Sequence, residues 1–167
     1  MIHSRTPTEE KMLARTRSLI VFIAVLAASA APALAQGGVA KVGQLLKASS
    51  YDFSQKTATV WSADFKGKSL STFRLVVAVQ DDVMVTFVTV AEKARLPMSV
   101  DFMHKLLRFN STLDRVKVGF DDDGDLFVRC DASVRILDAR ELAAIVDQVS
   151  AAADEVYKGI ANSLIAE

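Results

Sequence analysis

TFRLVVAVQDDVMVTFVTV, residues 72–90, is the stretch of this 167-residue chain that decides its fold. Two runs rich in β-branched and aromatic residues flank the acidic pair Asp81 and Asp82. Such runs favour strands, and a short polar pair between them is typical of a hairpin turn. Apolar residues occupy both alternating sets of positions, the second set including Val76, Ala78, Met84 and Val88. We therefore expect two central strands in a sheet that is covered on both faces.

Three further segments outside this hairpin have the composition of strands. Residues 57–65 come before it, and residues 116–120 and 126–136 form a second pair after it. Successive side chains of a strand point to opposite faces, so each of these segments should have an apolar and a polar side. In the second pair, the predicted polar side carries Arg115, Lys117, Arg129, Asp131 and Arg135.

The spacing of apolar residues predicts three helices. The first covers residues 39–46, and the second begins after Pro97 and Ser99 and continues to Phe109. The apolar set of the second helix is wide, so we expect most of it to be buried against the sheet or a partner. The third helix begins at Asp138, which forms a capping pattern with Glu141 three residues later. Its apolar stripe consists of Leu142, Ile145, Val146, Val149, Ala153, Val156, Ile160 and Leu164.

These elements predict an α+β fold in the order helix, three strands, helix, two strands, helix. We expect an antiparallel, curved sheet with the helices packed on it. The part of the chain that carries these elements contains no internal repeat, linker or low-complexity tract. Its length suits one domain with one hydrophobic core.

Residues 1–35 have the pattern of a secretory signal peptide. Lys11, Arg15 and Arg17 precede an apolar run over residues 19–28, and small residues stand at Ala33 and Ala35. The apolar run is too short for a membrane span, which needs about 20 residues. We expect cleavage after Ala35 and a periplasmic or secreted protein without a membrane span. An uncleaved N-terminal anchor is the alternative, and translation could start at Met1 or at Met12.

Composition excludes several classes of protein. The chain is 51% hydrophobic and 24% charged, with 20 basic and 20 acidic residues. These values argue against a disordered segment, a collagen-like repeat or a disulfide-stapled miniprotein. Beyond the predicted leader, acidic residues slightly outnumber basic ones. We therefore expect no nucleic-acid partner, because nucleic-acid binding generally needs a basic surface.

The predicted domain has few residues suited to catalysis or metal binding. Cys130 is its only cysteine and stands on the apolar side of a predicted strand, where we expect a buried, unreactive thiol. His104 is its only histidine and has no histidine or glutamate four residues away on its helix. A zinc site needs three or four ligands, and serine catalysis needs a histidine base. We therefore predict no enzyme, no catalytic residue, no cofactor and no metal site.

The acidic run at residues 121–125 is the strongest remaining candidate for a metal site. An EF-hand loop with Gly124 at its sixth position would require an acid where Gly119 stands and a glutamate where Cys130 stands. A hairpin turn in which Gly124 supplies a positive φ is the preferred interpretation, flanked by solvated Asp121, Asp122, Asp123 and Asp125. Weak binding of a divalent cation by this run is the alternative.

Three stretches in the second half of the chain resemble a known family. They are LLRFN at residues 106–110, DDDGDLFVR at residues 121–129, and LD at residues 137–138 followed by a helix that contains ADEVY at residues 153–157. Together they resemble the YbjN family of bacterial sensory-transduction regulators, which is similar in fold to the dimeric chaperones of type III secretion. The resemblance implies a YbjN-like domain over residues 36–167 and no active-site residue.

Two functions are compatible with these observations. The first is a non-enzymatic, exported binding or regulatory module with a secretion-chaperone-like scaffold, which we expect to be a homodimer that engages a protein or peptide by strand addition or in a groove. Secretion chaperones act in the cytosol, so the predicted leader argues against that specific role. The second function is a small-ligand sensor with an apolar pocket between the sheet and the helices.

Overall fold

The computed structural model describes residues 33–165 of the chain. The predicted leader lies outside them except for its last three residues, so the leader and its cleavage stay a prediction. The described residues form three α-helices, six strands and three short 3-10 helices. In chain order these are α2 (Ala33–Ala48), β1 (Ser54–Thr57), β2 (Val60–Lys66), β3 (Thr72–Gln80), β4 (Val83–Ala91), η1 (Lys93–Arg95), α3 (Val100–Thr112), β5 (Lys117–Phe120), β6 (Leu126–Ser133), η2 (Val134–Ile136), α4 (Ala139–Ile160) and η3 (Ala161–Ser163).

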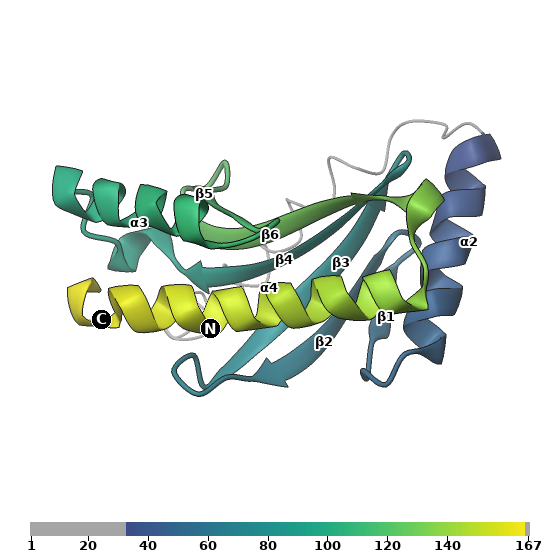
Figure 1. The fold of residues 1–167 in the computed structure, drawn as a ribbon, viewed down its shortest axis with the longest axis horizontal. Helices are drawn as coiled ribbons and strands as arrows, with labels where there is room; N and C mark the ends of the chain where they lie inside the picture. The colour runs from purple at the N-terminus through teal and green to yellow at the C-terminus, as the bar shows by residue number, and fades with distance from the viewer. Residues whose placement is uncertain (1–32, 166–167) are drawn as a thin grey trace, which may run out of the picture. The chain divides into compact units, whose positions relative to one another are not determined.

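The strands form one antiparallel sheet in the order β1-β2-β3-β4-β6-β5 (Figure 1). The predicted hairpin is confirmed: β3 pairs with β4, and the turn between them begins at Asp81, whose φ is 52°. The predicted α+β class, with helices on an antiparallel sheet, is confirmed as well. Strand β1 at one edge of the sheet and strand β5 at the other are both only four residues long.

Strand β1 is the main difference from the predicted order of elements. Residues 57–65 were expected to form one strand, but the chain turns back at Ala58 and Thr59. The residues before this turn pair with those after it, with Gln55 opposite Trp61. This turn contains no glycine, proline or asparagine, so the usual sequence signals of a hairpin are missing. The sheet therefore has four strands before α3 instead of three.

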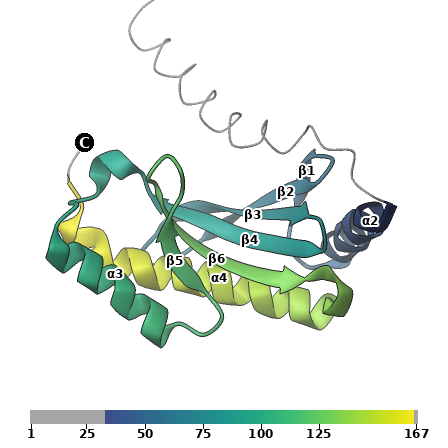
Figure 2. The same ribbon diagram turned by 90° about the horizontal axis from the view of Figure 1, so that it is seen from above.

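Helix α4 covers one face of the sheet and packs on β4 and β6 (Figure 2). The register places Leu75 opposite Val88 and Val79 opposite Met84, so all four side chains are buried beneath this helix layer. Val76 and Ala78 point to the other face, where they are only half-buried. The prediction that both faces are covered is therefore wrong for the second face. Met84 and Val88 lie on the same side as the main apolar set and do not cover that face.

The start and the apolar stripe of α4 are confirmed, except that Leu164 lies beyond the end of the helix at Ile160. The Asp138 carboxylate accepts a hydrogen bond from the backbone N–H of Glu141 at 2.7 Å, which caps the helix. The Glu141 side chain pairs with Arg115, so the capping is one-sided. The apolar stripe is buried from end to end of the helix, and its buried members are Leu142, Ile145, Val146, Val149, Ala152, Ala153, Val156 and Ile160.

Helix α3 is less buried than its sequence suggests. Ser99 caps it by accepting a hydrogen bond from Phe102 N, and only Phe102 and Leu106 are buried within it. Val100 and Leu107 are 71% and 63% exposed. The sheet therefore buries only part of this helix, which contacts mainly the short edge strand β5; burial of the rest against a partner, the other half of the expectation, stays a prediction. Among residues 33–165, no helix combines the length and the apolar character needed to cross a bilayer.

Two polar contacts tie a loop and a helix to the rest of the fold. The carboxylate of Asp154 on α4 accepts hydrogen bonds from the backbone N–H groups of Ser69 and Leu70, at 2.7 and 2.8 Å, which ties the β2–β3 loop to the helix. Lys41 Nζ donates to the carbonyl of Val134 at 2.8 Å, which ties α2 to η2, just after β6. Helix α2 is thereby held beside strand β1, at one end of the sheet (Figure 1).

Candidate binding groove beside strand β1

Cys130 and His104 lie on different elements, β6 and α3. Cys130 is buried on β6 opposite Thr86, as predicted, and burial raises the pKa of its thiol. His104 lies on the exposed side of α3. Within residues 33–165, no three His, Cys, Asp or Glu side chains are close enough together to hold a metal ion.

The acidic run at residues 121–125 is a hairpin turn held by its own side chains. The Asp121 carboxylate accepts hydrogen bonds from the N–H groups of Asp123 and Asp125, and Asp125 in turn accepts one from Lys93 N. Gly124 has a φ of 87°, which matches the preferred interpretation of this run. These contacts give the acidic residues a structural role in the turn.

The predicted polar side of β5 and β6 is found in part. Lys117 and Arg129 both hydrogen-bond Asp131, at 2.7 and 2.5 Å. Burial alone would raise the pKa of Asp131, but these two hydrogen bonds hold it below its usual value. Arg115 differs from the prediction: its φ of 64° turns the chain before β5, and its guanidinium pairs with Glu141 on α4 instead.

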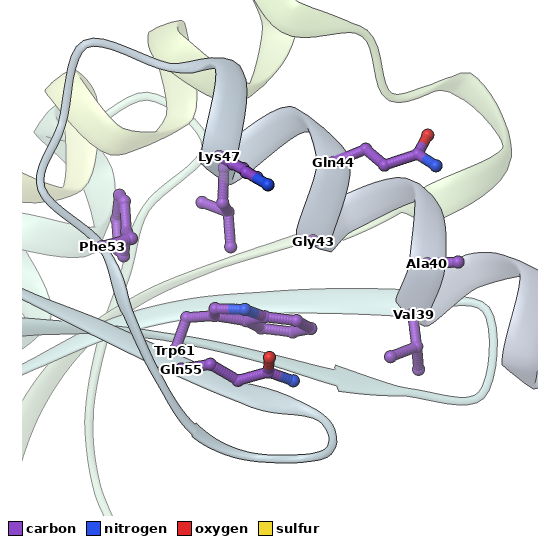
Figure 3. A pocket seen from close by; sticks show the side chains of 9 residues that line it. Val39, Ala40, Gly43, Gln44, Lys47, Phe53, Gln55 and Trp61 are labelled. Atoms are coloured by element: carbon purple, nitrogen blue, oxygen red, sulfur yellow. The ribbon is translucent and has the colours of Figure 1, made fainter.

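An open groove lies between α2 and strands β1 and β2 (Figure 3). Its volume is about 490 Å³, within the range of sites that hold small ligands or the side chains of a bound segment. Apolar residues from α2, from β2 and from Phe53 just before β1 form most of its lining, and β1 itself contributes the polar Gln55. The lining consists of Val39, Ala40, Gly43, Gln44, Leu46, Lys47, Phe53, Gln55 and Trp61.

A close approach between Gly43 and Trp61 gives the groove its depth. The indole of Trp61 lies beneath α2, between Phe53 and Val39 (Figure 3). A Cβ atom on Gly43 would stand 3.2 Å from the Trp61 ring, which is tighter than an ordinary contact. Glycine at this position therefore lets α2 pass close over the indole without a side chain in the groove.

Aromatic residues support the groove at the end where β1 begins. The rings of Tyr51, Phe53 and Phe65 lie 5.6 to 6.4 Å apart, and Phe65 stacks on Phe73 at 6.0 Å. The Tyr51 hydroxyl donates a hydrogen bond to Asp147 on α4 at 2.7 Å. Burial, this hydrogen bond and the charge of Asp147 raise the pKa of Tyr51 to about 12. Tyr51 therefore remains a neutral hydrogen-bond donor that ties the start of β1 to α4.

Strand β1 and the margin of the groove offer polar groups to a partner. Strand β1 is an edge strand, so backbone N–H and C=O groups along its outer side are not paired within the sheet. Gln55 extends from this strand along the groove, and Lys47 lies on the helix at the opposite margin (Figure 3). The arrangement can bind an extended chain through hydrogen bonds and one apolar contact.

Sequence reasoning did not find this groove. Residues 39–46 were assigned to a helix and Trp61 to a strand, but nothing local indicates that Gly43 lies over Trp61. A glycine within a predicted helix and a tryptophan within a predicted strand are each weak signals, and nothing in the sequence links the two. The missed turn at Ala58 also concealed the edge strand that borders the groove.

Comparison with known protein families gives a match over most of the chain. The sequence profile of the YbjN family, described as "Putative bacterial sensory transduction regulator", matches residues 40–162. No curated protein matches this chain in sequence.

Several solved structures are similar to this chain at low sequence identity. The crystal structure of YbjN from E. coli is 17% identical, with a TM-score of 0.55, over 77% of this chain and 94% of that one. The ExsC–ExsE complex gives 14% identity and a TM-score of 0.52, over 71% and 92% of the two chains. The Yersinia pestis type III secretion chaperone SycH, in complex with a fragment of YscM2, gives 12% identity and a TM-score of 0.42, over 71% and 96%.

Proposed function

Because this chain belongs to the YbjN family, we propose that it is a non-enzymatic binding or regulatory module that engages a segment of a partner protein. The observation that carries this proposal is the open groove between α2 and the edge strand β1. An apolar floor beside an unpaired strand edge suits an extended protein segment, which needs both side-chain pockets and backbone partners. The ExsC–ExsE structure, which shares this fold, is itself a complex of two proteins.

Export to the periplasm is the second part of the proposal. It rests on the pattern of residues 1–35, in which basic residues, a short apolar run and small residues precede Gln36. The partner segment would then belong to a protein that is exposed to the same compartment.

Homodimerisation is the third part, and α3 supports it. Val100 and Leu107 are seven residues apart, which is about two turns, so they lie on one side of this helix. Both are largely exposed. Met98, just before the helix, is 62% exposed as well. Large apolar side chains gathered on one exposed helix are typical of an interface, and a second copy of this chain would cover them.

A small-ligand sensor is the second candidate function. The volume of the groove and its mainly apolar lining are compatible with a compact metabolite. The groove is open rather than enclosed, which favours a protein segment, because a small ligand generally needs a pocket that surrounds most of its surface.

Selection of phage-displayed random dodecapeptides on the purified protein, expressed from the full chain, tests the main proposal. We expect enrichment of related peptides that bind with a Kd of about 1 to 100 μM. Thermal-shift measurements with a set of periplasmic metabolites provide the comparison. No peptide enrichment, together with stabilisation by one metabolite, would contradict segment binding and favour the sensor.

A further inference from the structure

The exposed side of α3 carries the same short pattern twice, an apolar residue followed by a charged one. Val100 and Asp101 form the first instance, and all of their side chains are exposed. Leu107 and Arg108, also exposed, form the second instance seven residues later. Seven residues are about two helical turns, so both instances lie on one side of the helix. His104 stands between them on this side and is exposed as well.

Resting on the homodimer of the proposed function, we infer that two copies of this chain pack α3 against α3 in antiparallel orientation, with the two His104 side chains facing each other, and that acidification separates the copies. The register of this interface follows from the spacing of the apolar and charged residues on α3. Its pH dependence follows from the position of the histidine.

Helix α3 has a side that no other element of the described domain covers. The helix lies at the end of the sheet opposite α2 (Figure 1). Phe102 and Leu106 are its buried residues, and Phe109 closely approaches Gly159 on α4. His104 lies on the other side and forms no ion pair within residues 33–165.

A two-fold axis at the middle of the exposed side would pair its two apolar residues with each other. In a symmetric dimer, a contact of residue i with residue j is matched by a contact of j with i. In antiparallel helices with the axis near His104, Val100 of one copy lies opposite Leu107 of the second copy, and this contact occurs twice. The two apolar side chains, 71% and 63% exposed in the single chain, would then leave water.

The charges on α3 favour the antiparallel orientation over the parallel one. In the antiparallel pair, Asp101 of one copy would lie beside Arg108 of the second copy, and opposite charges across an interface fix its register. In a symmetric parallel pair, Asp101 would be level with its own copy and about 10 Å along the helix from Arg108 of the second copy. Two like charges would then be the nearest ones.

His104 makes the antiparallel interface sensitive to acid. Histidine changes its charge between pH 5 and 8, and two neutral rings can pack at the axis, whereas two cations repel each other. Lys105 and Arg108 add positive charge on the same helix, and Asp101 is the only acidic residue of α3. Because separated copies would bind these protons more readily than paired copies, the dimer should lose stability as the pH falls.

The charged groups of the neighbouring elements lie away from His104. Strand β5 carries Lys117, which pairs with Asp131 on β6. The end of α4 carries the exposed residues Glu155 and Lys158. This end meets α3 at Phe109, which lies about 140° around the helix from His104. The charges that face His104 in the dimer are therefore those of α3 itself, from both copies.

Sedimentation velocity at pH 7.5 and pH 5.5, on protein expressed from the full chain, tests the response to acid. We expect the dimer Kd of the wild type to rise by about tenfold or more at pH 5.5. The control H104Q keeps a polar side chain that takes up no proton, and its Kd should change by less than about twofold. Equal responses of the wild type and H104Q would overturn the role of His104.

Cysteine substitutions test the register of the interface. H104C places two thiols beside the axis, where Cα atoms less than about 7 Å apart can be joined by a disulfide. S111C is the matched control, because Ser111 is exposed on the same side of α3 but meets its own copy only in a parallel pair. Under mild oxidation we expect H104C to form a covalent dimer and S111C to remain unlinked. Cross-linking of S111C would overturn the antiparallel orientation.

Exchange of charges tests the contact between Asp101 and Arg108. We expect D101R and R108D each to raise the dimer Kd by about fivefold or more at pH 7.5, because each places like charges across the interface. The double variant D101R/R108D restores opposite charges and should recover most of the affinity, with a wild-type circular dichroism spectrum. A double variant no better than the single ones would overturn this contact.

The results also separate the response to acid from the homodimer itself. A wild type that is monomeric at pH 7.5 would count against the proposed homodimer. A dimer that is lost in L107D but has the same Kd at pH 7.5 and pH 5.5 would contradict only the inference drawn from His104.

Discussion

Asp154 shows how one carboxylate can hold a loop in place. Its Oδ1 atom accepts two backbone N–H groups from the β2–β3 loop, and the close approach of Gly67 leaves no room for a side chain there. The hydrogen bond from Leu70, followed by that from Ser69, holds the pKa of Asp154 below its usual value. The ionised carboxylate is therefore the form that the folded protein favours.

We expect D154A to lower the free energy of unfolding by about 1 kcal/mol, because two loop N–H groups lose their acceptor. Because the folded pKa is lowered, the charge-dependent part of this contribution is fully present above the unfolded value of about 3.9 and is lost as the pH falls through the folded value. Urea unfolding of wild type and D154A should thus differ at pH 7 and converge in acid. D122A, which changes an exposed aspartate in the β5–β6 turn, is the control; a loss as large for D122A would contradict the specific role of Asp154.

At the scale of elements, agreement with the sequence depended on how local the signals are. The apolar stripe of α4 and its cap at Asp138 are local patterns, and both were predicted correctly. The turn at Ala58 has no characteristic residue, so strand β1 was not foreseen. The groove depends on Gly43 lying over Trp61. This contact joins residues far apart in the sequence, and no local pattern predicts it.

Helix α3 carries the prediction that belongs to this scale. Its apolar positions were expected to pack on the sheet or on a partner, and within this chain Leu107 and Val100 stay exposed. We expect the wild type to be a dimer by native mass spectrometry and L107D to be a monomer, because a carboxylate in an apolar interface is costly to desolvate.

Ile136 provides the matched control for this experiment. It is 76% exposed but lies in η2, away from α3 in sequence. I136D should therefore remain a dimer. A monomeric wild type, or a dimer that survives L107D, would contradict the assignment of the interface to α3.

At the scale of the whole chain, export can be tested by the mass of the released protein. Expression of the full chain in a bacterium should yield a periplasmic form that begins at Gln36, as intact mass spectrometry would show. A35K should leave the leader attached, because the site needs a small residue before the cleaved bond. A wild-type protein that keeps residues 1–35 would instead support the uncleaved anchor.

Cleavage after Ala35 would also shorten α2, which spans Ala33–Ala48, by its first three residues. The groove residues of this helix begin at Val39, so they would remain in the mature protein. Removal of the leader is therefore compatible with an intact binding site.

Helix α4 follows all six strands in the chain, and this order has a consequence for biosynthesis. Until residues 139–160 have left the ribosome, the part of the apolar face over β4 and β6 lacks its helix, and the nascent chain cannot complete its final fold. Under the proposed export, this order would keep the chain unfolded until its last helix has been made. The same arrangement would make any product that stops before α4 prone to aggregate, because its largest apolar surface would stay exposed.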